Sequence, residues 1–494
     1  MPRARWQNRN ARRSSFPINL LHVVIVSLAA LHILIQLPMQ FVEPDGVAYS
    51  LGAVRLLSGR IAFDSRAPLF QMLLAFSFAV FGRNLLSAVL FPQLFGISAV
   101  ILVFALANHL YDRITAFVAV ILVLINLPLV NLSALVLRES LLCTLVLSAL
   151  YVALRFRGLR RSLLLGIVVG LLYWTREDMA ALVIPLSIFL YFDRNGLRSV
   201  LAMLISSALV ASPWAFYSLR AFGTLTPSTM VFESVWGNVY SPSTHTFFAI
   251  MGGVFYGINL LPSTLTLFAS FFFIVGMIGK LGRKQFLLFG AFVTMLIVDS
   301  SPIFYRMAWP MPWDWSDATR YLLPVALPLL IFSAKGLTRI GEFSVNRKET
   351  RSVGRIVWSS DRQLKGLLLV GILLFGAGYF ALWQSFRSQS ELPYDRAASY
   401  LISNGINASV MSFHPGMLSS RYQRGLAFAI PAEANLTSIV EFAQTNGIHY
   451  LLIGWDMTEL NEDLILLFLS PQSSAATFRY VTGQPGVWAL YYIA

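Results

Sequence analysis

Acidic and arginine side chains lie beside several apolar segments of this chain, where charge is costly and therefore informative. Asp45 follows the first apolar segment, in Glu43-Pro44-Asp45-Gly46, and Arg66 precedes another, in Asp64-Ser65-Arg66-Ala67-Pro68. A positioned carboxylate can accept a proton, and the planar fork of an arginine offers a phosphate two parallel hydrogen bonds. These residue types predict proton abstraction and phosphate recognition beside a membrane surface.

Three further segments repeat this combination of charge and apolar sequence. Their charged residues are Arg138-Glu139, the break Thr175-Arg176-Glu177-Asp178, and Arg320 with the neighbouring Tyr321. Each arginine can instead be an anchor whose guanidinium reaches the lipid headgroups. Because acids and arginines recur at the same ends of several segments, the sequence also fits one shared site formed by those ends.

Asp45 has a structural interpretation as well as a chemical one. It precedes a predicted helix over 47–57, so its carboxylate can cap the free backbone N–H groups there. Tyr49 lies four residues further on, and the two share a helix face if the helix begins early enough. Aromatic residues of later loops, such as Trp236 and Trp313, fit either the aromatic belt of a membrane interface or sugar stacking.

The composition identifies the class of protein that positions these residues. The 494 residues are 57% apolar and 12% charged, whereas an average soluble domain has about 25% charged residues. An ordinary soluble enzyme, a disordered chain and a coiled coil are therefore excluded. We expect an all-α polytopic membrane protein with about eleven transmembrane helices. The predicted spans are 16–39, 86–107, 114–133, 140–154, 162–175, 178–192, 199–217, 262–279, 285–300, 320–335 and 366–384.

Basic residues orient these spans. Of the 37 Lys and Arg, 23 lie in six segments between spans, which the positive-inside rule assigns to the cytoplasm. We expect an integral protein of the plasma or inner membrane with its N-terminus in the cytoplasm. The net charge of +14 then reflects orientation, and no nucleic acid is needed to explain it. The six segments are 1–15, 108–113, 155–161, 193–198, 280–284 and 335–365.

Three parts follow from this layout. Residues 1–15 form a basic cytoplasmic tail, 16–385 a transmembrane module, and 386–494 a small extracytoplasmic α/β domain. In the last part, helices at 397–404 and 438–446 alternate with strands at 409–413 and 450–454. The apolar run 67–82 is short and is predicted as an interfacial or re-entrant helix. The outer loops of the module are 40–85, 218–261 and 301–319.

Metal and redox chemistry receive little support. The single cysteine, Cys143, lies in an apolar run, which excludes a disulfide framework and a CxxC site. The six histidines show no HExxH motif. We expect no dedicated histidine metal site.

The order of the motifs resembles the GT-C glycosyltransferases, especially the branch of the protein O-mannosyltransferases and the lipid A aminoarabinose transferase. The resemblance covers about residues 40–340, and the tail motif Gly447–Ile453 resembles extracytoplasmic domains of bacterial and archaeal members. The matching motifs are the acid of the first outer loop with Tyr49, Leu56-Leu57-Ser58-Gly59, Arg66-Ala67-Pro68-Leu69-Phe70, Glu139, the hairpin from Gly170 to Glu177, and Arg320-Tyr321-Leu322-Leu323-Pro324.

This resemblance implies an inverting transfer of a sugar from a polyprenyl-phosphate carrier to a hydroxyl acceptor outside the cytoplasm. It implies Asp45 as the base, although the adjacent acids of the O-mannosyltransferases are here separated by Pro44, so Glu43 remains an alternative. Some relatives use a divalent metal, which Asp45 and Glu139 could hold. The implied substrate-binding residues are Arg66 and Arg320 first, then Tyr49, Arg138, Glu139, Arg176 and Tyr321.

The sequence leaves the sugar, the prenyl length and the acceptor open, and the acceptor can be a glycan, a lipid or a protein. A second hypothesis is a transporter or flippase of a lipid-linked or small polar substrate, whose usual sign is two repeated halves; the sequence shows no such repeat. A third is an assembly scaffold that uses the C-terminal domain, which leaves the charges beside the spans unexplained.

Overall fold

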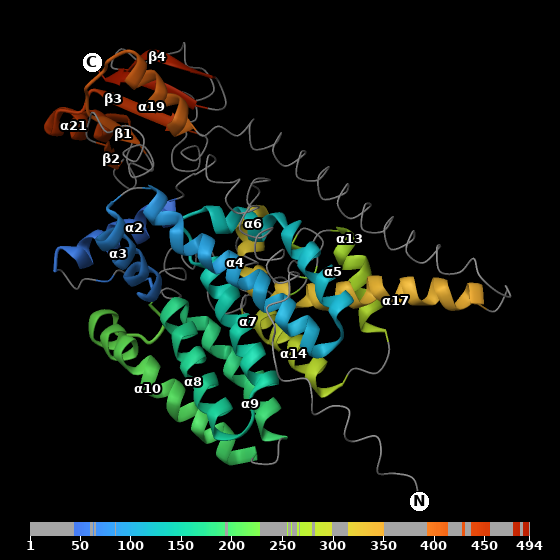
Figure 1. The fold of residues 1–494 in the computed structure, drawn as a ribbon. Coiled ribbons are helices and arrows are strands. Elements are labelled where there is room, and N and C mark those ends of the chain that lie inside the picture. Colours follow the sequence, from blue (N-terminus) through green and yellow to red (C-terminus); the bar gives the residue numbers. More distant parts are fainter. Residues whose placement is uncertain are drawn as a thin grey trace, which may run out of the picture. The chain divides into compact units, whose positions relative to one another are not determined.

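The structure, a computed structural model, describes most of the chain and divides it into two compact units (Figure 1). The larger unit is Met1–Gln40 with Gly52–Gly376, and the smaller is Phe41–Leu51 with Ala377–Ala494. The described residues are 44–59, 63, 66–83, 85–192, 196–227, 254, 258, 264–265, 267–278, 282–298, 315–349, 393–412, 427–429, 436–454, 478–484 and 488–493.

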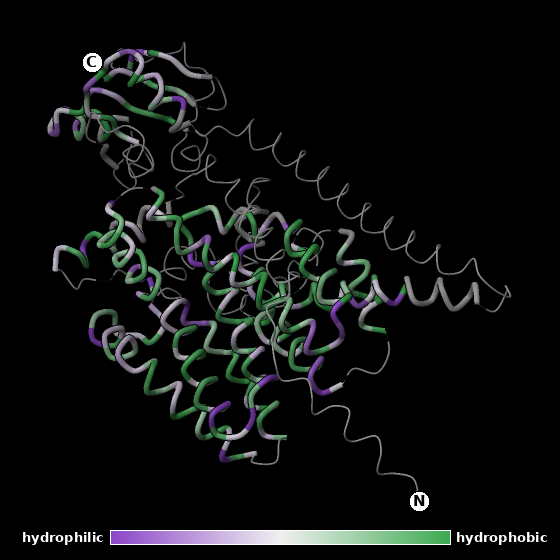
Figure 2. Tube along the Cα trace, in the orientation of Figure 1, coloured by the Kyte–Doolittle hydropathy of each residue, from purple (hydrophilic) through white to green (hydrophobic). Residues whose placement is uncertain are grey.

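Helices make up the larger unit. Figure 2 shows hydrophobic residues along most of their length, as expected of segments that face lipid or each other. Helix α2 (Pro44–Leu57) extends across the boundary between the units. The others are α3 (Leu69–Phe81), α4 (Leu85–Leu110), α5 (Arg113–Leu124), α6 (Leu127–Ala134), α7 (Glu139–Arg155), α8 (Gly158–Thr175), η2 (Glu177–Leu182), α9 (Val183–Tyr191), α10 (Gly196–Phe222), α13 (Leu267–Met277), α14 (Arg283–Val298), α16 (Trp315–Ala326), η3 (Leu327–Leu329) and α17 (Leu330–Glu349).

Four described helices are long and apolar enough to cross a membrane: Leu86–Leu110, Gly158–Thr175, Gly196–Phe222 and Arg320–Ile340. A fifth is possible if α5 and α6, which are bent by 64°, form one span. Other predicted spans form shorter helices, including α7, α9, α13 and α14. The spans predicted at 16–39 and 366–384, most of the loops 218–261 and 301–319, and Trp236 and Trp313 lie outside the described residues, so the count of eleven stays a prediction.

Two breaks in the helices have clear chemical causes. Helix α8 ends at Thr175, and extended backbone at Arg176 leads into the 3-10 turn η2, which confirms the predicted polar break. Between α5 and α6, the amide of the buried Asn126 accepts from the Leu129 N–H at 3.0 Å and donates to the Thr264 carbonyl at 2.7 Å. The side chain thus satisfies backbone groups that the bend would leave without partners.

Glycines allow two helix pairs to approach closely. A Cβ on Gly276 of α13 would lie 1.9 Å from the Phe332 carbonyl oxygen, and one on Gly336 of α17 would lie 2.0 Å from that of Phe272. The two helices therefore meet backbone to backbone at reciprocal glycines. In the α8–α10 pair, Gly166 approaches the Met203 carbonyl in the same way, which is typical of small residues between membrane helices.

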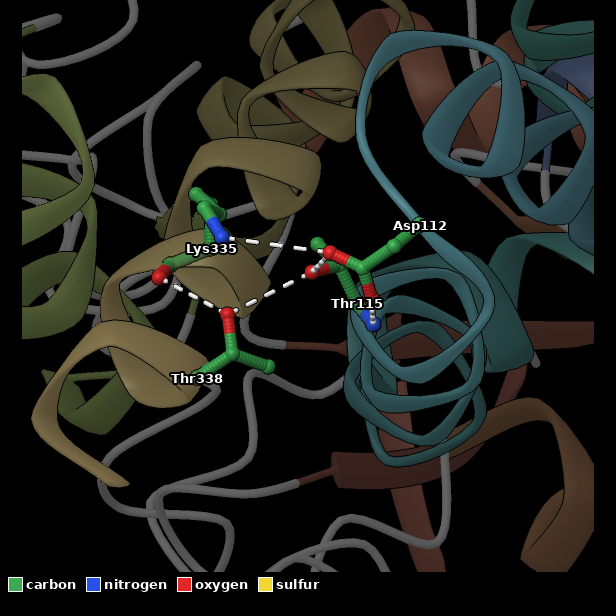
Figure 3. A network of polar contacts seen from close by, with 4 residues as sticks. All are labelled: Asp112, Thr115, Lys335 and Thr338. Carbon is green, nitrogen blue, oxygen red and sulfur yellow. Dashed lines mark hydrogen bonds and ion pairs between the residues drawn. The ribbon is translucent and has the colours of Figure 1, made fainter. Parts of the chain in front are cut away.

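A polar network joins α5 to α17 (Figure 3). Asp112 caps α5 by accepting from the Thr115 N–H at 2.9 Å, and the hydroxyls of Thr115 and Thr338 lie 3.3 Å apart. Lys335 Nζ lies 3.8 Å from Asp112 Oδ2. Burial raises the pKa of Asp112, but the bonds from Thr115 and the charge of Lys335 outweigh it and hold that pKa below its usual value.

The smaller unit contains a five-stranded mixed sheet in the order β2-β1-β3-β5-β4. Strand β1 pairs in parallel with β2 and β3, whereas β5 pairs antiparallel with β3 and β4. Helices and strands occur at the four places where the sequence predicted them, and β2, β4 and β5 are additional. The elements are α19 (Pro393–Ser403), β1 (Val410–Ser412), β2 (Ala427–Ala429), α21 (Leu436–Asn446), β3 (Tyr450–Gly454), β4 (Phe478–Gln484) and β5 (Trp488–Ile493).

Alternation along β3 gives this sheet two apolar faces. Leu451 and Ile453 pack in one core with Ile439 of α21, and Leu452 packs in another with Leu401 of α19. Successive strand residues point to opposite faces, so each face needs its own cover, and one helix contributes to each core. The side of the membrane on which this unit lies stays a prediction.

Candidate functional site

Two arginines from distant parts of the sequence lie against the ring of Tyr321. The guanidinium of Arg176, at the break after α8, is 5.3 Å from the ring centroid, and that of Arg320, on α16, is 5.4 Å away. Both arginines are buried, with 3% and 8% of their surface exposed. The negative face of an aromatic ring stabilises a nearby cation, most strongly where water is excluded. Tyr321 therefore holds two cations in one place.

A carboxylate balances one of these charges. Arg176 Nε lies 2.7 Å from Asp178 Oδ1, with extended backbone at Arg176 allowing its side chain to reach residue 178. The Asp178 side chain is 23% exposed and that of Arg176 only 4%. The site thus brings together two guanidinium groups, each of which can donate two parallel hydrogen bonds to an anionic group such as a phosphate.

Glu139 provides a buried carboxylate in the same unit. It begins α7, which packs against α16, and only 5% of its surface is exposed. Its Oε2 atom has no hydrogen-bond partner among the residues that the structure describes. A buried carboxylate oxygen without a donor is costly, so Glu139 is suited to receive a hydroxyl, an amine or a cation.

Arg138, which the sequence placed among the substrate-binding residues, has a structural partner. Its Nη1 donates to the Thr175 carbonyl at 3.0 Å, one of the carbonyls that the end of α8 leaves without an intrahelical donor. Arg138 therefore ties the beginning of α7 to the end of α8. The two segments that carry Glu139 and Arg176 are fixed to each other by this bond.

An aromatic cluster on α10 was not predicted. The buried Trp214 donates from Nε1 to Glu177 Oε1 at 3.1 Å and stacks on Tyr217 with ring centroids 5.5 Å apart. The Tyr217 hydroxyl accepts from the Phe63 N–H at 3.1 Å. A Trp and a Tyr three residues apart on one helix face were the available signal. The cluster links the break after α8 to the loop that leads to Arg66.

The structure also describes the candidate residues of the first outer loop, which are Asp45, Tyr49 and Arg66. Asp45 lies in the first turn of α2, because the helix begins at Pro44 and not after Asp45; the N-cap interpretation is therefore wrong, and proline suits a first helical position. Tyr49 is buried one turn further along. Arg66 is partly buried just before α3. Asp45 and Tyr49 belong to the smaller unit, and Arg66 to the larger.

A metal centre built from protein side chains is not evident. Among the residues that the structure describes, no three His, Cys, Asp or Glu side chains form a group that could hold a metal ion. The pair named by the sequence, Asp45 and Glu139, falls in different units. Metal use by this chain stays open.

Comparison with known proteins identifies the fold. Residues 65–217, from before α3 into α10, match the dolichyl-phosphate-mannose-protein mannosyltransferase family model. A search of the curated proteins finds no match to this chain. Among solved structures, the chain is similar to ArnT from Cupriavidus metallidurans in the apo state, with a TM-score of 0.62 and 12% identity over 96% of this chain and 97% of that one.

Two other solved structures also have a fold similar to that of this chain. ArnT bound to undecaprenyl phosphate matches with a TM-score of 0.60 at 14% identity, over 96% of this chain and 98% of that one. The Archaeoglobus fulgidus oligosaccharyltransferase in complex with Zn and sulfate matches with a TM-score of 0.53 at 13% identity, over 94% and 72%. The chain therefore has the fold of the GT-C glycosyltransferases, as the order of its motifs predicted.

Proposed function

We propose that this protein is an inverting glycosyltransferase that moves a sugar from a polyprenyl-phosphate carrier to a hydroxyl acceptor. The observation that carries the proposal is the pair of buried arginines, Arg176 and Arg320, on one Tyr321 ring. Such a pair fits the phosphate of a lipid-linked donor, and ArnT, which has a similar fold, binds undecaprenyl phosphate. The bundle of apolar helices offers a surface for the prenyl chain.

The reaction needs a base and a cationic pocket. The acceptor oxygen attacks the anomeric carbon as the bond from that carbon to the phosphate oxygen breaks. The acceptor proton passes to a carboxylate, and the polyprenyl phosphate leaves with the bonding electrons. Because the leaving group is already an anion, it needs positive charge more than a proton. Arg176 and Arg320 supply that charge, and Arg66 contributes from the loop before α3.

We assign the base to Asp45 on the sequence motif, with Glu43 as the alternative. Asp45 lies in the first turn of α2. Tyr49 contributes from the following turn. Glu139, with its oxygen that lacks a donor, is suited to a sugar hydroxyl or amine, or to a divalent cation if one is used.

The proposal includes the orientation of the chain across the membrane. The N-terminus lies in the cytoplasm and residues 386–494 outside it, so transfer takes place on the extracytoplasmic side. The acceptor is a glycan, a lipid or a protein on that side. A protease applied to sealed, right-side-out vesicles should cleave the smaller unit. Its complete protection in such vesicles would contradict this orientation.

The test of function is donor turnover by the purified full-length chain in lipid nanodiscs. Polyprenyl-phosphate donors with mannose, glucose, arabinofuranose and aminoarabinose are supplied with a membrane extract as acceptor, and released polyprenyl phosphate is measured by mass spectrometry. We expect release from at least one donor and none from an Asp45→Asn, Glu43→Gln double variant. Movement of a donor across sealed vesicles with no sugar transferred would instead favour the flippase hypothesis.

A further inference from the structure

A second cluster of cations lies at the opposite end of α7 and α8 from the candidate site. Arg155 lies in the last turn of α7, whose 17 residues place it about 25 Å from Glu139. Figure 2 shows hydrophilic residues at the lower ends of α8 and α14. The basic cluster, as we define it, consists of His109 of α4, Arg155 of α7, Arg161 of α8, and Arg283 and Lys284 of α14.

One aromatic ring gathers two of these arginines. The guanidinium of Arg161 is 5.9 Å from the ring centroid of Phe189 on α9, and that of Arg283 is 4.8 Å from it. Arg283 also donates to the Phe189 carbonyl, while Arg161 is buried. One cation from α8 and one from α14 thus lie against the same ring of α9.

The other members converge beside them. Lys284 Nζ lies 3.2 Å from His109 Nε2, a distance at which a neutral imidazole accepts from the ammonium. The same imidazole bonds to the backbone of Leu154, and the charge of Arg155 acts on it. The lysine is therefore held in a defined position by α4.

Three cations of the basic cluster are not balanced by acids in the described part of the chain. Among the residues that the structure describes, Arg155, Arg283 and Lys284 take part in no ion pair. The positive-inside rule explains why basic residues occur at these helix ends. It does not require cations from α7, α8 and α14 to meet, and their repulsion favours an anion between them.

Exposed apolar side chains surround the cluster. Ile188 precedes Phe189 and is 56% exposed, Phe286 lies two residues after Lys284 and is 63% exposed, and Leu163 lies two residues after Arg161 and is 43% exposed. Cations at the ends of membrane helices, with apolar surface one turn further along, match a phosphate headgroup followed by acyl chains.

We propose that the basic cluster binds the phosphate of an anionic phospholipid. Arg283 and Lys284 contact the phosphate from α14, Arg155 from the end of α7 and Arg161 from the beginning of α8. The acyl chains lie along Ile188 and Phe286. The site is separate from the candidate transferase site and needs no sugar donor. Its occupancy holds α4, α7, α8, α9 and α14 together at this end.

The test uses the full-length chain purified in detergent and titrated with phosphatidylglycerol, phosphatidylcholine or inorganic phosphate. Thermal unfolding and the lipid retained in native mass spectrometry are measured. The test variant is Arg283→Gln with Lys284→Gln. The control is Arg198→Gln, which removes an exposed charge from the first turn of α10. Arg283→Lys keeps the charge if the double variant does not fold.

We expect phosphatidylglycerol to raise the unfolding temperature and phosphatidylcholine to leave it unchanged. The double variant should need on the order of thirtyfold more phosphatidylglycerol for the same effect, because two surface charges are lost. The Arg198→Gln and Arg283→Lys variants should respond nearly as the natural chain does. Equal stabilisation by inorganic phosphate, or an unchanged response of the double variant, would overturn the proposal.

Discussion

Arg176 and Arg320 are brought together by one residue, since the guanidinium groups of both lie within 5.4 Å of the Tyr321 ring centroid. The first ends α8 and the second lies on α16, so the pairing depends on the fold. Asp178 neutralises one charge at 2.7 Å. The Tyr321 ring and Asp178 thus hold the two cations in one place in the larger unit.

The contribution of the Tyr321 ring to stability can be tested separately from that of its hydroxyl. Tyr321→Phe keeps the aromatic face, whereas Tyr321→Leu removes the quadrupole that two buried cations contact. We expect Tyr321→Leu to lower the free energy of unfolding by about 1–3 kcal/mol, and Tyr321→Phe by clearly less. Thermal and denaturant unfolding in detergent measure the difference. Equal losses in both variants would show that the ring face does not hold the arginines.

The hydrogen bond from Trp214 can be tested by removing the indole N–H, the only polar group of this side chain. Trp214→Phe keeps an aromatic side chain but removes the donor to Glu177 Oε1. Because Glu177 is buried, we expect a loss of about 1–3 kcal/mol in the free energy of unfolding. Glu177→Gln, which keeps an oxygen acceptor for the indole, is the matched control and should cost less. If Trp214→Phe is neutral in unfolding experiments, this bond does not stabilise the break after α8.

Gly336 should not tolerate a larger residue. A Cβ there would lie 2.0 Å from the Phe272 carbonyl oxygen, a backbone atom that cannot move alone. We expect Gly336→Ala to cost about 1–3 kcal/mol, as for an overpacked core. Gly290→Ala is the control, since its Cβ would meet only the Pro185 side chain at 3.7 Å. Similar unfolding temperatures for the two variants would contradict the close α13–α17 contact.

Asp112 predicts a dependence of stability on pH. Its pKa is lowered from 3.8 in the folded state, so its ionised form contributes stability that is complete above that value and is lost as pH falls through the folded pKa. The contribution is small, because the side chain is 49% exposed. Asp112→Asn should therefore be less stable than the natural chain at pH 7, and this difference should be smaller at pH 3. Thermal unfolding at both pH values provides the check.

The stability of the smaller unit should depend on pH in the opposite direction, because of Tyr491. Burial, and then the neighbouring Tyr480, raise the pKa of Tyr491 to about 12. A raised pKa means that the neutral form stabilises the fold below about pH 10, and that this contribution is lost as pH rises to about 12. Absorbance of tyrosinate during an alkaline titration should show a late step whose amplitude is smaller by one tyrosine in Tyr491→Phe. An unchanged amplitude of this step in Tyr491→Phe would contradict the prediction.

Sequence patterns predicted individual helices and breaks better than they predicted which residues of different helices contact each other. The break at Arg176 and the helices after Arg138 and around Arg320 follow from charge between apolar runs. The Trp214 cluster was missed, because a tryptophan inside an apolar helix has no distinct signal until its partner Glu177 is known. The pairing of Arg176 with Arg320 depends on how α8 and α16 pack, which periodicity does not encode.

The number of membrane spans is a second feature that sequence patterns alone do not determine. Hydropathy finds apolar segments, but the bend of 64° between α5 and α6 arises from Asn126 and its bonds to Leu129 and Thr264. Mean hydropathy cannot distinguish such a bent pair from one straight helix. In the smaller unit, β1 and β2 have only three residues each, and β2 has too few residues for a pattern of period two to be recognised.

The most direct test of the central claim is the affinity of the arginine pair for a prenyl phosphate. Binding of undecaprenyl phosphate to the chain in nanodiscs can be measured for the natural protein, Arg176→Gln, Arg320→Gln and the control Arg220→Gln, an exposed arginine in the last turn of α10. Each buried charge contributes about 1.5–3 kcal/mol to a phosphate bond. We predict at least tenfold weaker binding for the first two variants and unchanged binding for the control. Unchanged affinity in Arg176→Gln and Arg320→Gln would contradict the account.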